Sequence, residues 1–173
     1  MDLSALLPLI DEAVDLDRLR RRMSDQDALM LGVSDGAKAT AIAALARGAQ
    51  QPMLIIVPKP QHAEALVEEL RAWLGAQERD RVLLFPERDA LPYERLSPDP
   101  ADVHQRLNVL DAFATAALMA PLVVAPAAAV AQCTLTPEEA RRATVAVGRG
   151  ERMDMQDFLR ALDAGGYRIE PQV

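Results

Sequence analysis

The sequence predicts an α/β protein built on a doubly wound, mostly parallel β-sheet with helices on both faces. Short, continuous apolar runs recur along the 173-residue chain, at 28–33, 53–58, 81–86 and 121–126. Longer stretches with apolar residues at helical spacing separate these runs. Continuously apolar strands that alternate with helices are typical of a parallel sheet buried on both faces, and the helical connections in such sheets are right-handed.

The first half of the chain supplies two strand-and-helix pairs after a helical lead-in. Residues 1–25 predict that lead-in, with a break around Val14. "ALMLGV" (28–33) predicts the first strand, and "KATAIAALARGA" (38–49) predicts the helix after it. "MLIIVP" (53–58) predicts a second strand that Pro58 closes, and "QHAEALVEELRAWLG" (61–75) an amphipathic helix that stops at Gly75.

The second half of the chain predicts the last two strands of the sheet and the start of a second domain. "RVLLFP" (81–86) and "PLVVAP" (121–126) predict two further strands, joined by a helix at roughly 101–118 with Asp99 as N-cap and Pro100 in its first turn. After about residue 140, "ATVAVGRGERM" predicts a strand and a turn, and "DMQDFLRALDAGGY" a helix capped by Asp154. The final "YRIEPQV" predicts the opening of another strand. We therefore expect a core domain over 26–140 and, from 141 to 173, the beginning of a truncated second α+β domain.

Composition argues against several classes of function. The net charge of -7 disfavours a broad surface for non-specific phosphate contacts. Aromatic residues make up 3% of the chain, which disfavours a protein that stacks single-stranded bases. The N-terminus lacks the basic region of a signal peptide and no run reaches the roughly 20 apolar residues of a membrane helix, so we expect a cytoplasmic protein without membrane contact.

The stretch from 32 to 40 partly follows the phosphate-loop pattern G-x-x-x-x-G-K-[ST]. Gly32 and Lys38 take the first glycine and the lysine positions, but Ala37 replaces the last glycine and Ala39 the hydroxyl residue that would bind magnesium. The methyl of Ala37 would crowd a backbone position suited to positive φ, and Asp35 beside the lysine repels phosphate. Residue types alone favour a tight strand-to-helix turn over a nucleotide site. The candidate vestigial loop comprises Gly32, Ser34, Asp35, Gly36, Ala37 and Lys38.

The sequence contains no residue pattern typical of a catalytic or metal-binding site. His62 and His104 lack partners at metal-ligand spacing, and Glu68 and Glu69 point in different directions on a helix. We therefore predict no catalytic residue and no metal site. The segment 83–110 is unusual because its four prolines require a well-specified loop, which serves either as a binding surface or as a cover for the strand ends.

Several motifs in order resemble the N-terminal region of the bacterial transcription-repair coupling factor family (Mfd). "LLFPERDALPYERLSPDP", followed by Arg106 and Leu107, looks like the signature of that region. "MLIIVPKPQHAEALVEELRAWLG", "PLVVAPAAAVAQ" and "GRGERMDMQDFLRALDAGGYRIEPQV" are similar to its other elements, so the resemblance covers 28–173. The signature residues that we single out are Leu91, Pro92, Tyr93, Glu94, Ser97, Pro98 and Asp99.

The resemblance implies a role and a fold type. Proteins of this family displace RNA polymerase stalled at DNA lesions with a separate ATP-driven translocase module and recruit UvrA for nucleotide excision repair. Their N-terminal region resembles the repair protein UvrB, which implies a sheet of the P-loop NTPase and helicase type with a degenerate phosphate loop. ATP and magnesium are then expected only in the translocase module, and UvrA contacts mainly in the second domain.

Two other readings remain open from the sequence. One is a divergent ATP-binding domain of the helicase type with a functional Lys38; the lack of an acidic D-E-x-[DHN] box after any strand disfavours it. The other is a UvrB-like domain that binds damaged DNA. The acidic charge and the short "PERDALPYERLSPDP" segment, in place of an aromatic β-hairpin, count against this second reading.

Overall fold

The computed structural model describes residues 2–13, 15–25, 28–88, 99–114, 119–145, 147–165 and 167. The chain divides into two compact units, Met1–Cys133 and Thr134–Val173. Within the described residues, no helix combines the length and the apolarity needed to cross a membrane.

Two helices form the lead-in, and the predicted break between them is confirmed. A short 3-10 helix, η1 (Ser4–Leu6), is followed by α1 (Leu7–Ala13) and α2 (Leu16–Asp25). Leu7 and Leu16 are buried in the main core, so both helices pack onto the unit rather than extending from it. The Nη2 of Arg20 donates a hydrogen bond of 2.6 Å to the backbone oxygen of Ala44, which ties α2 to the next helix.

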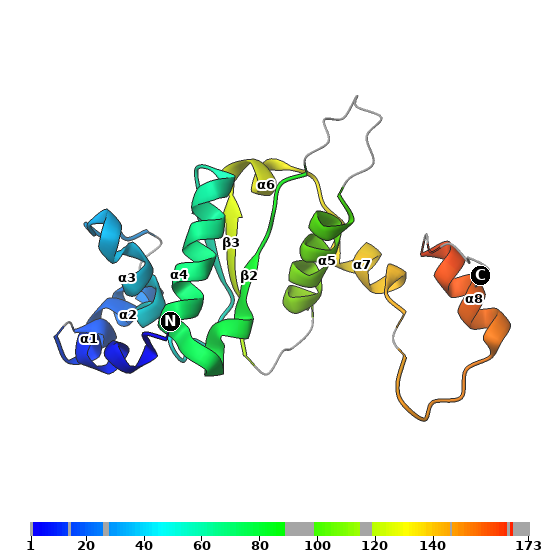
Figure 1. Ribbon diagram of the computed structural model, residues 1–173, viewed down its shortest axis with the longest axis horizontal. Helices are drawn as coiled ribbons and strands as arrows, with labels where there is room; N and C mark the ends of the chain where they lie inside the picture. The colour runs from blue at the N-terminus through cyan, green and yellow to red at the C-terminus, as the bar shows by residue number, and fades with distance from the viewer. Residues whose placement is uncertain are drawn as a thin grey trace. The chain divides into compact units, whose positions relative to one another are not determined.

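A three-stranded parallel sheet forms the centre of the first unit (Figure 1). Its strands are β1 (Met53–Val57), β2 (Val82–Leu84) and β3 (Leu122–Pro126), in the spatial order β1-β3-β2. Val124 of β3 lies opposite Ile55 of β1 and Leu84 of β2. Every residue of β3 is buried because it has a strand on each side and a helical layer on each face. The prediction of parallel strands at these three places is confirmed.

Helices cover both faces of this small open sheet. The helix α4 (Pro60–Glu78) lies on one side of the sheet and α5 (Pro100–Ala114) on the other (Figure 1). Val124 packs in the core with Leu70 of α4, whereas Val123 packs in a second cluster with Val109 of α5. This division follows from the period-2 alternation of strand side chains. The face of β1 that carries Leu54 and Ile56 is covered only in part, since these side chains are 48% and 55% exposed.

The predicted first strand is wrong. Residues 28–34 form no strand, and Met30 is 97% exposed while Leu31 is 43% exposed. The run is as apolar as the strands of the sheet, but a strand also needs a neighbour that completes its backbone hydrogen bonds. Residues 28–33 pair with none of the three strands of the described sheet. The tight turn therefore leads into a helix without a strand before it.

The remaining elements of the first unit follow the expected order. They are η2 (Asp35–Ala37), α3 (Lys38–Ala46), η3 (Arg79–Arg81) and α6 (Ala127–Ala131). The predicted stop at Gly75 appears as a break inside α4, where this residue has φ 66° and ψ -169°. The backbone there leaves the helical region, and a helical turn resumes after it.

The second unit contains two capped helices, α7 (Pro137–Ala143) and α8 (Met155–Ala164). Thr136 and Glu139 form a reciprocal capping box at the start of α7. Asp154 caps α8 by accepting hydrogen bonds from the N–H groups of Gln156 and Asp157, as predicted. The predicted strand after residue 142 is not seen among the described residues of that segment. The expected terminal strand, "YRIEPQV" (167–173), lies outside the described residues except for Tyr167.

Candidate functional site

The candidate phosphate loop is a tight turn that leads directly into α3. Ser34 is extended, η2 follows, and the N–H of Ala37 donates a 3.0 Å hydrogen bond to the backbone oxygen of Ser34. Ala37 has φ -103° and ψ -2°, a conformation open to any residue. The expectation that its methyl crowds a position suited to positive φ is therefore wrong. Neither Gly32 nor Gly36 has positive φ, and a Cβ on either would meet no atom within 4 Å.

Lys38 forms an ion pair with a residue of its own loop. Its Nζ lies 2.6 Å from the Oδ1 of Asp35 in an exposed ion pair. The hydrogen bond from Lys38, together with its charge, holds the pKa of the Asp35 carboxyl below its ordinary value. An anion that approached the start of α3 would have to displace this carboxylate, and would also meet its negative charge.

The position that would hold magnesium faces the protein interior. Ala39 is 2% exposed and belongs to the apolar side of α3, which packs against α4. A hydroxyl at this position would be directed into the core rather than toward a ligand. The structure thus brings Ser34, Asp35, Ala37 and Lys38 together, but as a self-contained turn.

Most of the signature loop falls on residues that the structure does not describe: Leu91, Pro92, Tyr93, Glu94, Ser97 and Pro98. Asp99 is described and confirms the predicted helix start. Its Oδ1 accepts a 2.8 Å hydrogen bond from the N–H of Ala101, and α5 begins at Pro100. The carboxylate satisfies one of the free N–H groups of the first turn.

Arg106 anchors the segment that leads into the signature loop. It is 4% exposed, its Nη1 donates a 2.6 Å hydrogen bond to the backbone oxygen of Pro86, and its guanidinium lies 4.0 Å from the centre of the Phe85 ring. Burial lowers the pKa of Arg106, and the charge of Arg88 lowers it further. Gln132 completes the anchor: its Oε1 accepts from the N–H of Arg88 at 2.9 Å. Sequence reasoning quoted Arg106 only as part of a motif and did not predict its burial.

A second buried arginine ties the opposite end of the sheet together. Arg81 donates from Nη2 to the backbone oxygen of Ala46 and to the Oε2 of Glu78, at 2.6 Å each. Its Nη1 donates to the backbone oxygen of Ala120 at 3.1 Å. Arg81 thus joins the end of α3 to the entrance of β3. Nothing in the sequence pattern distinguishes it from the exposed arginines.

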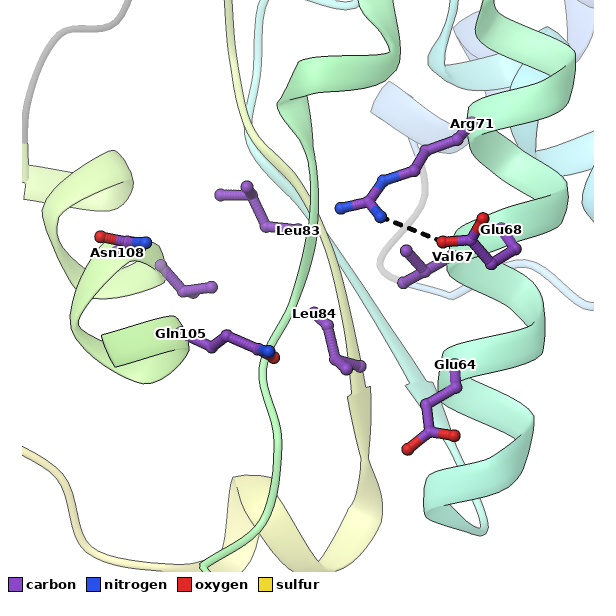
Figure 2. A pocket seen from close by; sticks show the side chains of 9 residues that line it. Glu64, Val67, Glu68, Arg71, Leu83, Leu84, Gln105 and Asn108 are labelled. Carbon is purple, nitrogen blue, oxygen red and sulfur yellow. Dashed lines mark hydrogen bonds and ion pairs between the residues drawn. The ribbon is translucent and has the colours of Figure 1, made fainter. Parts of the chain in front are cut away.

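A groove of about 300 Å³ lies along the edge of β2 that faces away from β3, called the free edge here because no other described strand pairs with it (Figure 2). Side chains of α4 line one wall, side chains of α5 line the other, and β2 lies between them. Arg71 bridges α4 and the strand, since its Nη1 lies 3.1 Å from the Oε1 of Glu68 and its Nη2 donates to the backbone oxygen of Val82 at 3.1 Å. The lining residues are Glu64, Val67, Glu68, Arg71, Leu83, Leu84, Gln105, Asn108 and Val109. Sequence reasoning missed this site because its residues come from three separate segments.

Comparison with known proteins supports the resemblance predicted from the motifs. No protein-family model matches the chain. The chain is 28% identical over 165 residues, 94% of its length, to the transcription-repair-coupling factor of Myxococcus xanthus, of which it covers 13%. It is 28% identical over 148 residues, 85% of its length, to the same-named protein of Haemophilus influenzae, of which it covers 12%. That of Mycobacterium tuberculosis is 34% identical over 109 residues, 62% of this chain and 8% of the relative.

These relatives share one name, and the predicted resemblance to transcription-repair-coupling factors is confirmed. The chain spans about an eighth of the length of the first two relatives, with 13% and 12% covered. It is similar to one region of these proteins.

Proposed function

We propose that this chain acts as a non-catalytic scaffold module of a transcription-repair-coupling factor. The similarity to such proteins over 94% and 85% of the chain supports the context. In this proposal, residues 26–140 form a UvrB-like domain of the P-loop type, and residues 141–173 begin the second domain. The division into compact units after Cys133 supports a boundary in this part of the chain.

The observation that carries the proposal is the state of Lys38. In a working phosphate loop the lysine reaches the phosphates and a hydroxyl binds magnesium. Here the Lys38 ammonium lies 2.6 Å from a carboxylate of its own loop, and the residue after it is a buried alanine. The ion pair of Lys38 opposes phosphate binding, and the buried alanine after it cannot bind magnesium. The segment remains as a turn, which is consistent with a scaffold role.

The partners belong to the same proposal and come from the resemblance. UvrA is recruited mainly through the second domain. RNA polymerase and DNA are engaged by other parts of the longer protein, where ATP and magnesium serve the translocase. This module holds the second domain in place for UvrA.

Calorimetry with ATP and magnesium tests the non-catalytic role. We expect no heat of binding for the chain, for its Lys38→Ala variant, or for Asp35→Asn, which releases the lysine but restores no magnesium ligand. Micromolar binding by the unaltered chain that disappears in Lys38→Ala would contradict the proposal in favour of an ATP-binding domain. Phosphate release by the chain alone would do the same.

A gel-shift assay separates the scaffold from a DNA-binding domain. With damaged duplex at low salt we expect no shifted band, because the chain is acidic and charge-driven binding needs a basic surface. A shift that salt abolishes would favour a UvrB-like domain that binds damaged DNA.

A further inference from the structure

We propose that the free edge of β2 is a docking site for an extended, basic segment of a partner protein, which joins the sheet as a fourth strand. The site is the groove between α4 and α5 shown in Figure 2. This surface is separate from the vestigial loop, and the proposal does not depend on the role suggested above for the whole module.

The side chains of β2 show that the groove opens along the plane of the sheet. Leu83 and Leu84 are consecutive residues of one strand, so their side chains point to opposite faces. Both nevertheless line the groove, together with Val67 from the α4 layer and Val109 from the α5 layer. A cavity bounded by both faces and both helical layers lies beside the strand edge. Its place is the one that the next strand of the sheet would occupy.

Backbone groups of β2 are available on that side. The N–H of Phe85 donates to the oxygen of Val124 on β3 at 2.9 Å, so residues 83 and 85 direct their backbone groups to β3. In a parallel strand the alternate residues, Val82 and Leu84, direct theirs to the free edge. The backbone oxygen of Val82 already accepts a hydrogen bond from the Arg71 side chain. Leu84 is therefore the residue with which an added strand pairs first, and Arg71 marks one end of the groove.

Charge indicates the chemistry of the incoming segment. The α4 wall carries the carboxylates of Glu64 and Glu68, and Arg71 is already paired with Glu68. Among the described residues that line the groove, the carboxylates of Glu64 and Glu68 outnumber the one guanidinium, that of Arg71. A strand with Lys or Arg facing α4 gains attraction from Glu64 and Glu68.

The α5 wall sets the other face of the segment. Gln105 and Asn108 of α5 line this wall with amide side chains, and Val109 of α5 and Leu83 of β2 add apolar surface. Residues of the incoming strand that face α5 should therefore be small and apolar or capable of hydrogen bonding. A second copy of this chain is a poor occupant, because edge-to-edge pairing would bring Glu64 and Glu68 against the same residues in a chain of net charge -7.

Fluorescence anisotropy with labelled synthetic peptides tests the proposal on the full chain. The probe is Gly-Lys-Val-Lys-Val-Lys-Gly, and the control peptides replace each Lys by Glu or the second Val by Pro. We expect saturable binding of the probe, with Kd on the order of 10–100 µM because few backbone hydrogen bonds form. The Glu peptide should bind at least about tenfold more weakly, since its charges oppose those of the groove. The Pro peptide should also lose affinity because it lacks one strand N–H.

A matched pair of charge reversals locates the site. Glu64→Lys should weaken binding about fivefold, the effect of one reversed charge pair at an exposed site. Glu69→Lys makes the same charge change five residues further along α4, on an exposed side chain that does not line the groove. This variant should change the affinity for the probe by less than about twofold. Binding should also shift the amide resonance of Leu84.

Equal weakening by both variants would show attraction to the whole acidic chain and would overturn the proposal. So would equal affinity for the Lys and Glu peptides, or the absence of saturable binding up to about 1 mM probe. Self-association of the unaltered chain that Glu64→Lys alters but Glu69→Lys does not would assign the edge to a second copy instead, and would overturn the proposal as well.

Discussion

Replacement of Gly75 by alanine should loosen the attachment of the N-terminal lead-in to α4. Gly75 has φ 66° and ψ -169°, a region of backbone conformation that is essentially restricted to glycine. A Cβ built there lies 2.7 Å from the Oγ of Ser4, 2.8 Å from its Cβ and 2.9 Å from the Oδ1 of Asp2. The glycine thus permits both the turn of the chain and the close approach of the N-terminal segment.

The magnitude follows from two contributions. Forcing alanine into this conformation costs about 1–3 kcal/mol. Movement of Ser4 away from the new methyl group weakens two nearby hydrogen bonds: Ser4 N–H to Asp2 Oδ1 at 2.9 Å and Leu3 N–H to the oxygen of Ala72 at 2.8 Å. Each is worth about 1 kcal/mol. We expect Gly75→Ala to lower the free energy of unfolding by about 3–5 kcal/mol.

Gly48→Ala is the matched control. Gly48 has φ 68°, nearly the same as Gly75, but a Cβ there meets no atom within 4 Å. Gly48→Ala should lower the free energy of unfolding by about 1–2 kcal/mol, because the only penalty is the left-handed backbone conformation of an alanine. The two variants therefore separate backbone strain from steric contact with the lead-in.

Urea unfolding measures both variants, with circular dichroism and the fluorescence of Trp73 as probes. Trp73 lies in α4 and packs against the core near Gly75, so it reports on this region. The expected difference between the variants is about 2 kcal/mol, roughly a thirtyfold difference in the unfolding equilibrium. Equal losses of stability, or a larger loss for Gly48→Ala, would refute the assignment of Gly75 as the contact point for Ser4.

Two further predictions concern the arginine anchor and the second unit. Arg106→Ala should lower the free energy of unfolding by about 3 kcal/mol in a urea titration, since it removes a charged hydrogen bond to Pro86 and the contact with Phe85. The stability of Arg106→Lys should lie between those of the unaltered chain and Arg106→Ala. An unchanged free energy of unfolding in either variant would contradict the role of Arg106 as an anchor. Hydrogen bonds from the backbone N–H of Thr136 and, second, from its hydroxyl lower the pKa of Glu139 from its ordinary value. Thr136→Ala removes only the hydroxyl, so an NMR titration should show the pKa of Glu139 rising part of the way toward that ordinary value. Because the folded pKa is lowered, this capping contribution is complete above the ordinary pKa of a glutamate and is lost as the pH falls through the lowered folded pKa.

Local signals predicted the elements that depend on local chemistry. Asp99 and Asp154 were predicted as caps, and each accepts the hydrogen bonds that a cap requires. The helix around 61–75 was predicted from its apolar face, and Gly75 marks the break within it. The apolar runs at 53–57 and 122–126 form strands. These features depend on a few neighbouring residues, so the sequence contains the needed information.

The vestigial loop was predicted in part. Residue types indicated that Ala37 and Ala39 break the phosphate-loop pattern, and that Asp35 opposes an anion. The structure gave a different reason for Ala37, whose φ of -103° needs no glycine, and supplied the 2.6 Å contact between Lys38 and Asp35. Which partner a lysine takes depends on where the turn places its ammonium, and spacing alone does not determine that.

Residue types and short-range periodicity were enough to predict the α/β class, most helices and strands, two helix caps, the acidic charge and the resemblance to coupling factors. Contacts between distant segments leave 28–33 out of the sheet, bury Arg81 and Arg106, and place a groove between α4, β2 and α5. These three features share one cause, since each depends on partners that lie far away in the sequence. A strand needs a neighbouring strand, a buried guanidinium needs carbonyl oxygens from distant segments, and an edge groove needs two helices on opposite faces.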